Sequence, residues 1–407
     1  MPRSSRRHGA SLVLLAIPLF ACGEGAGTSH DDPVESIVLG APAVRYGSLD
    51  GADALVPVGD LTMDSDGGVW ATQAQDGSVL AIDAAGERRL AVGGLGEGPG
   101  EFSAVSGLGR LGDTLWINDR QARRTTFYTR SGELLGTAPF PEAVPPGVDP
   151  ADEGPSPLSV TFHGPTRGGA IHDTGPGANE LMDPASPLGG DDPILLTPPA
   201  GGDTRVVAMR SGTRPQAILA RRSNGQIAAI SIYRQPFSDG SLTALDERGD
   251  GLVVVDRPVL PAGSAHRYRV TRIGTTGDTV WSVERAYEPM PADVAKQDSI
   301  VQAMAEQAES EELVRDRLFL PPTMPPARDV FVGLDGRVWV ARERADRMQA
   351  ARWDLFAPDG RLEAEVTVPG GVELEAADSA GVWGVETDEL DVPYLVRFEL
   401  SGGPGLD

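Results

Sequence analysis

Residues 329–368 read DVFVGLDGRVWVARERADRMQAARWDLFAPDGRLEAEVTV and contain four short apolar runs. Asp-Gly pairs at 335–336 and 359–360 each separate two of these runs. Because glycine accepts a positive φ at no steric cost, Asp-Gly between alternating apolar residues is a strong signal for a β-hairpin. The stretch therefore predicts one antiparallel unit of four strands.

The same kind of turn, followed by tryptophan or an aliphatic residue, recurs along the chain. Its other copies are Asp66-Gly67-Gly68-Val69-Trp70, Gly112-Asp113-Thr114-Leu115-Trp116, Gly249-Asp250-Gly251-Leu252-Val253, Ala380-Gly381-Val382-Trp383 and the degenerate Gly168-Gly169-Ala170-Ile171. Four-stranded repeats with a period of roughly 40 to 50 residues are typical of propeller blades. We expect an all-β fold, a six-bladed β-propeller of four-stranded antiparallel blades.

The expected blade boundaries follow from these turns. The blades span residues 60–92, 102–137, 158–233, 241–283, 329–368 and 372–400. The third blade is the least regular, and a separate hairpin within 217–232 would make seven blades. The last blade has only three predicted strands, so a strand within 34–46 is expected to complete it and close the ring. The propeller domain should then cover 34–402, with a short tail at 403–407.

The N-terminus resembles a bacterial lipoprotein signal. Three arginines precede an apolar segment, residues 12–20, which is shorter than the roughly 20 residues needed to span a bilayer. The motif Leu19-Phe20-Ala21-Cys22 is similar to a lipobox, and this resemblance implies cleavage of residues 1–21 and acylation of Cys22. Residues 22–33 would form a polar tether. We expect an exported, membrane-anchored protein of the periplasm or cell surface; a plain secretory signal with an incidental cysteine is the alternative.

Charge and cysteine content exclude several classes. The formal charge is -24, so the protein should repel nucleic acid and anionic lipid headgroups. Cys22 is the single cysteine, so no intramolecular disulfide can form.

Three long segments should lie on one face of the ring, because each joins second to third strands or neighbouring blades. They are 139–157, 174–202 and 286–328. The third contains a helical pattern within 291–318, with Asp293 as a possible N-cap. Loops on a rigid scaffold often carry function, so we expect any site on this loop face.

Blade two resembles a stretch of NHL-repeat and bacterial six-bladed propeller lipoproteins. The matching residues are Gly100-Glu101-Phe102, Gly112-Asp113, Leu115-Trp116-Ile117, Asp119, Arg124 and Gly132. The resemblance implies a six-bladed fold. It implies no single activity, because such propellers include binding modules and some enzymes.

The loop-face candidates are charged residues beside the predicted loops. They are Glu97, Glu101, Asp119, Arg124, Arg342 and Asp346. Ligand binding is one role for these residues. The alternative is structural: Asp119 with Arg124, and Arg342 with Asp346, would form exposed ion pairs that hold loops and contribute about 0–1 kcal/mol each.

Signals for metals and nucleophiles are weak. Besides the tether residue His30, the mature chain has His163, His172 and His266, a poor match to the zinc-binding histidines of amidating-lyase propellers. Calcium is compatible with the acidic excess, although no EF-hand spacing supports it. No Gly-x-Ser-x-Gly nucleophile elbow occurs.

The sequence favours a monomeric binding or scaffolding module that presents its loop face to a protein, peptide or glycan. The alternative is a cation-dependent lyase or lactone hydrolase with carboxylates around the central channel. A structural envelope component without a discrete ligand is a third possibility.

Overall fold

The computed structural model describes residues 34–144, 146, 159–176, 180–181, 183, 186–199, 202–221, 227–306 and 310–400, without the side chains of 159 and 217–233. The predicted signal peptide, Cys22, the tether and the tail therefore lie outside the described residues. Among those described, no helix is long and apolar enough to cross a membrane.

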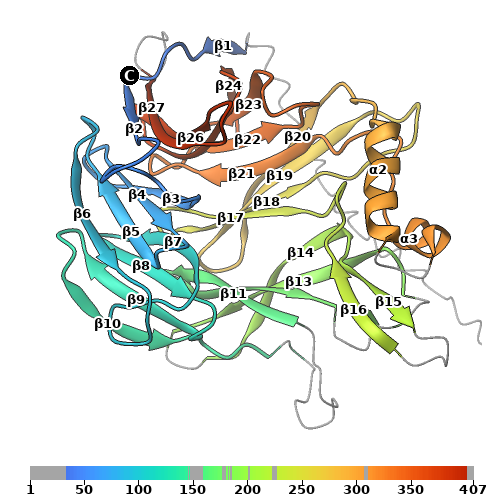
Figure 1. Ribbon diagram of the computed structural model, residues 1–407, viewed down its shortest axis with the longest axis horizontal. Coiled ribbons are helices and arrows are strands. Elements are labelled where there is room, and N and C mark those ends of the chain that lie inside the picture. Colours follow the sequence, from blue (N-terminus) through green and yellow to red (C-terminus); the bar gives the residue numbers. More distant parts are fainter. Residues whose placement is uncertain are drawn as a thin grey trace, which may run out of the picture. The chain divides into compact units, whose positions relative to one another are not determined.

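The prediction of a six-bladed β-propeller is confirmed (Figure 1). In each blade, consecutive strands pair antiparallel, and the first strand is innermost in the ring. Blade one consists of β3 (Val58–Met63), β4 (Val69–Gln73), β5 (Ser78–Ile82) and β6 (Arg88–Gly93), and blade two of β7 (Val105–Leu111), β8 (Thr114–Asp119), β9 (Arg124–Thr129) and β10 (Leu134–Pro139). Blade three consists of β11 (Ser159–Thr166), β12 (Gly169–Gly175), β13 (Gly189–Thr197) and β14 (Arg205–Thr213), and blade four of β17 (Leu242–Leu245), β18 (Gly251–Asp256), β19 (Arg267–Gly274) and β20 (Thr279–Ala286). Blade five consists of β21 (Ala327–Val332), β22 (Val338–Arg342), β23 (Ala351–Phe356) and β24 (Leu362–Val368), and blade six of β25 (Val372–Ala377), β26 (Gly381–Thr387), β27 (Pro393–Glu399) and β2 (Val44–Tyr46).

Blade three differs from its predicted boundaries. It ends with β14, and the following β15 (Gln216–Arg221) and β16 (Ile227–Tyr233) form a separate two-stranded hairpin. A hairpin alone does not make a seventh four-stranded blade. The segment 174–202 is not one long loop either, because it contains β13, whose buried residues 194–196 form a short apolar run among Gly, Pro and Asp.

The N-terminal strand closes the ring as predicted. β2 pairs antiparallel with β27 and completes blade six, with Arg45 opposite Val396. The preceding β1 (Glu35–Val38) was not predicted to pair elsewhere, yet it lies parallel to β24 as a fifth strand of blade five. The N-terminal segment therefore joins the outer edges of two neighbouring blades.

The hydrophobic core lies within and between the blades. Trp70, Trp339, Trp353 and Trp383 are all fully buried. Trp383 also donates from Nε1 to the carbonyl of Gly67 in blade one, at 3.0 Å. A tryptophan after the turn thus fills the space beside the neighbouring blade, which explains why this position recurs in the repeat.

The insertion between blades four and five contains α2 (Val294–Ala305) and α3 (Glu311–Arg317), as the helical pattern predicted. Asp293 caps α2 by accepting from the Lys296 amide, and Val301, Val314 and Leu318 bury against one another. Helix α3 lies next to the β15–β16 hairpin (Figure 1).

Candidate functional site

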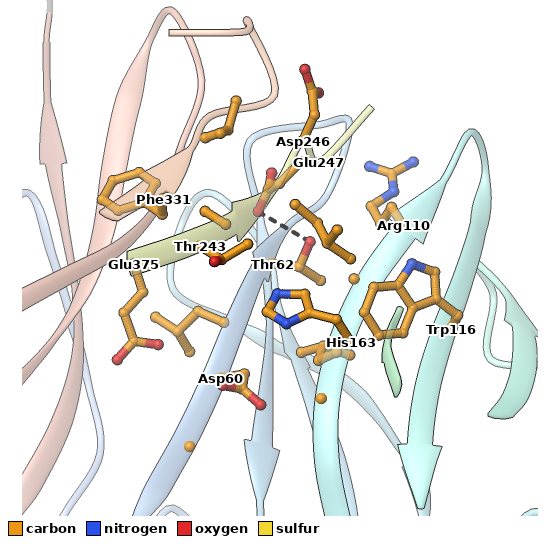
Figure 2. A pocket seen from close by; sticks show the side chains of 18 of the residues that line it. Asp60, Thr62, Arg110, Trp116, His163, Thr243, Asp246, Glu247, Phe331 and Glu375 are labelled. Carbon is orange, nitrogen blue, oxygen red and sulfur yellow. Dashed lines mark hydrogen bonds between the residues drawn. The ribbon is translucent and has the colours of Figure 1, made fainter. Parts of the chain in front are cut away.

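The innermost strands of the six blades surround a central cavity of about 510 Å³. Figure 2 shows titratable side chains from several of these strands pointing into it. Its charged and ionisable lining residues are Asp60, Arg110, His163, Asp246, Glu247, Asp329 and Glu375. Apolar groups such as Phe331 and Trp116 form much of the remaining wall.

Irregular pairing helps to place several of these residues. Five innermost strands shift register against the second strand of their blade. The extra residues at four of these shifts line the cavity; they are Asp60, Ser106, His163 and Glu375. A β-bulge bends a strand and re-aims its side chains, and bulges are frequent beside active sites. The bulges therefore bring polar side chains from different blades to one cavity.

Three cavity carboxyls have raised pKa values. Burial raises the pKa of Asp329 to about 6, although the Val330 amide donates to its carboxylate at 2.8 Å. Burial, followed by the charges of Asp329 and Asp60, raises the pKa of Glu375 well above its ordinary 4.5. Desolvation by the surrounding channel also raises the pKa of Asp60, although this residue keeps contact with solvent. The charge of His163 opposes that shift. These groups can act as hydrogen-bond donors at a higher pH than ordinary carboxylic acids.

His163 lies beside a charged cluster at this cavity. Its Nδ1 lies 3.6 Å from the carboxylate of Asp173 on β12, and Arg210 lies 3.2 Å from the same oxygen. Burial favours protonation of Asp173, but His163 and Arg210 outweigh it and hold the pKa of Asp173 below its ordinary value. A carboxylate on the Nδ1 side of the ring leaves Nε2 available to a ligand.

A fourth carboxyl, Glu247, lies at the end of the cavity near the tight turns that join first to second strands. Its Oε1 accepts from the Thr62 hydroxyl at 3.1 Å and from the Met63 amide at 3.3 Å. Burial raises the pKa of Glu247 to about 8 despite these hydrogen bonds and the positive charge of Arg110.

The predicted residues of blade two hold a loop and do not line the cavity. Asp119 is fully buried and accepts from the amides of Ser103, Ala104, Gln121 and Ala122. Arg124 donates to the carbonyls of Glu97, Gly98 and Glu101, and the Glu101 carboxylate accepts from the Gly98 amide. Asp119 and Arg124 therefore pin the 97–104 segment through backbone groups and not through the predicted ion pair.

The predicted pair in blade five is also separated. Arg342 binds the buried carboxylate of Asp354, with Nε 2.9 Å from Oδ2. Asp346 is exposed and accepts from the Met348 amide within its own loop. The structure thus brings Arg342 into the protein interior and leaves Asp346 at the surface, and neither lines the cavity.

The described residues contain no group of three or more His, Cys, Asp and Glu side chains arranged to hold a metal ion. Calcium usually takes six to eight oxygen ligands. The cavity carboxyls therefore do not fit a preassembled calcium centre, and His163 and the buried His172 do not supplement them as zinc ligands.

The raised pKa of Glu247 predicts how stability depends on pH. A carboxyl whose pKa is higher in the folded chain binds its proton more tightly there, so stability falls as pH rises from the unfolded pKa to the folded one. For Glu247 this window runs from 4.5 to about 8, whereas buried His172, with a pKa lowered to about 4, acts in the opposite direction below 6.5. Urea unfolding should therefore show stability falling between pH 6.5 and 8. Glu247→Gln should reduce this slope; an unchanged slope would contradict the assignment.

The sequence matches no family model and no curated protein. Its fold is similar to that of Agrobacterium tumefaciens regucalcin, a calcium-binding protein, at 12% identity and a TM-score of 0.37 over 91% of this chain and 98% of that chain. It is also similar to a Xanthomonas campestris gluconolactonase, at 12% identity and 0.40 over 90% and 98%. A third similar structure is Staphylococcus aureus virginiamycin B lyase, at 13% identity and 0.29 over 89% and 86%. These likenesses concern the propeller fold, which enzymes and other proteins share.

Proposed function

We propose that the central channel binds a small organic molecule and acts on it by general acid–base catalysis, as an enzyme of the lactone-hydrolase or lyase class. The main support is one observation: Asp60, Asp329 and Glu375 converge on a single cavity with raised pKa values. His163 faces the same cavity (Figure 2). Ionisable groups with shifted pKa values gathered in a pocket are typical of acid–base sites.

The chemistry assigns different roles to these groups. Glu375 holds a proton at a pH where an ordinary glutamate has lost it, so it serves as the acid. His163 Nε2 serves as the base, with Asp173 holding the ring. For a lactone, the base takes a proton from water while the water oxygen bonds to the carbonyl carbon. The ring C–O bond then breaks, and Glu375 gives its proton to the departing oxygen, which yields the hydroxy acid.

The channel is a better candidate than the loop face. The loop-face binding hypothesis relied on six charged residues, and Asp119, Arg124 and Arg342 use their polar atoms to hold backbone or buried carboxylates. A binding module without turnover would use the same channel cavity. We further propose that a lipid on Cys22 displays the propeller outside the cytoplasm, which the lipobox resemblance supports.

Purified protein should open glucono-δ-lactone or γ-butyrolactone faster than buffer, as measured by acid release in a pH-stat. Glu375→Gln should lower the rate by about 10²- to 10⁴-fold, because the general acid is lost. Glu284→Gln is the matched control, since Glu284 pairs with Arg269 on the exposed face of β19 and β20. Its rate should stay near that of the wild type.

The same assay separates the other possibilities. A lactone that raises the melting temperature of the wild type but not of Glu375→Gln, without acid release, would support binding alone. If neither lactone is hydrolysed and neither raises the melting temperature, the channel is not a lactone site. Because the described cavity carboxyls do not fit a preassembled calcium centre, added calcium or EDTA should leave the rate unchanged.

A further inference from the structure

Glu247 crosses the axis of the propeller. It follows β17 in the tight turn of blade four, and its carboxylate bonds to Thr62 and Met63 at the end of β3 in blade one (Figure 2). Blades one and four lie three positions apart in both directions around a six-bladed ring, so they face each other across the channel. A hydrogen bond between them must therefore run across the channel.

Other charged groups surround Glu247 at this end. Arg110 on β7 is 5% exposed, and it donates to the carbonyls of Met63 at 3.2 Å and Gly112 at 3.0 Å. The negative charge of Asp335, in the turn of blade five, raises the pKa of Glu247, whereas the positive charge of Arg110 lowers it. Glu247 Oε2 is enclosed and has no hydrogen-bond partner. Charged groups of blades two and five thus influence a carboxyl that blade four carries and that hydrogen-bonds to blade one.

The neighbouring turn residue reinforces this packing. Asp246 is 3% exposed and pairs with Arg272, which also donates to the Gly336 carbonyl of blade five at 2.8 Å. Asp246 additionally forms a β-bridge with Val332 on β21. The turn that carries Glu247 is therefore anchored to the neighbouring blade.

The opposite end of the cavity is more open. Asp60 precedes Met63 by three residues, roughly 10 Å along a strand, and it is exposed. The Asp329 carboxylate bonds to the Val330 amide of its own strand and so does not need a partner across the channel.

We propose that Glu247 is a positioning residue that closes the turn-face end of the channel, so that the cavity is a blind pocket entered only from the loop face. A ligand would pass Asp60 on entry and would leave by the same route. The ligand in this statement rests on the proposed function, but the closure itself depends only on the contacts of Glu247. The closed end would limit how far a substrate extends into the pocket.

Thiol labelling tests the closure without any ligand. Cys22→Ser removes the single native cysteine, and Leu245→Cys then places a thiol on the cavity wall beside Glu247. Fluorescein maleimide should label this thiol slowly when residue 247 is Glu. In Glu247→Ala, labelling should be at least about tenfold faster, because the turn-face end is open. In Glu247→Gln, it should stay slow, since the amide oxygen can still accept from Thr62 and Met63.

Ser106→Cys, on the cavity wall contributed by β7, is the positional control, and its labelling rate should be the same with all three residues at 247. This control also reports that each variant is folded. Equal rates at Leu245→Cys with Glu and Ala at 247 would overturn the proposal, as would fast labelling with Gln. Because labelling requires no turnover, inactive protein with the expected labelling pattern would contradict the proposed function alone.

Discussion

Replacing Asp354 by alanine is expected to lower the free energy of unfolding by about 3–5 kcal/mol, because Arg342 and Arg285 lose their buried partner and keep only the more exposed Glu365. Asp354 lies on β23 with 0% exposure, and it accepts from Arg342 and from the hydroxyl of Tyr268 on β19. Arg285 lies 3.5 Å away. Asp354 therefore binds Arg342 within blade five and also links blade five to Tyr268 of blade four. Urea unfolding followed by far-UV circular dichroism measures the loss of stability.

An exposed ion pair in the same part of the propeller is the control. Glu284 and Arg269 are 2.8 Å apart, with 45% and 54% of their side chains exposed. Glu284→Ala should cost less than about 1 kcal/mol, because solvent screens such pairs. Asp354→Asn should fall between the two, since the amide oxygen can still accept one hydrogen bond. Similar losses for Asp354→Ala and Glu284→Ala would contradict the role given to Asp354.

The fold could be predicted because its turns are local. Gly67, Gly336 and Gly360 have φ values of 82°, 83° and 89°, which glycine adopts without strain. Each turn fixes the strands on both sides, and the tryptophan that follows it indicates a buried face. The sequence alone did not show whether β15 and β16 belong to a blade, because their sequences resemble those of blade strands. The structure shows that blade three is already complete without them.

The charged partners could not be predicted from distance along the chain. Arg342 and Asp346 are close in sequence, yet strand pairing brings β22 beside β23 and offers Asp354 instead. A local spacing rule suits a helix, where neighbours on one face are a few residues apart. In a blade, the partner lies on the next strand, so the register must be known first.

The sequence contains a spacing pattern that indicates part of the channel site. Asp60 and Asp329 each stand six residues before the aspartate of a turn, Asp66 and Asp335. Equal spacing from equivalent turns indicates similar depth in the channel. Glu375 and His163 do not share this spacing, because the residues six positions after them, 381 and 169, are glycines.

Removing β2 is expected to have an effect as large as that of Asp354→Ala. Tyr46 is 9% exposed and packs in the cluster that joins blades six and one, with Met63, Trp383 and Leu395. Loss of a buried aromatic side chain alone typically costs about 3–5 kcal/mol. A variant that begins at residue 48 should therefore unfold at a much lower urea concentration. It should also associate, because β27 becomes an open edge strand.

A variant that begins at Leu39 is the matched comparison. It lacks β1, whose Val38 is 72% exposed, but it keeps β2 and its pairing with β27. Because β1 adds a half-exposed strand to a blade that is already complete, this variant should sediment as the full-length protein does in sedimentation velocity and lose little stability. If both variants unfold at the same urea concentration, β2 does not close the ring energetically. Pairing of β2 with β27 would then add no more to the free energy of unfolding than β1 adds at the outer edge of blade five.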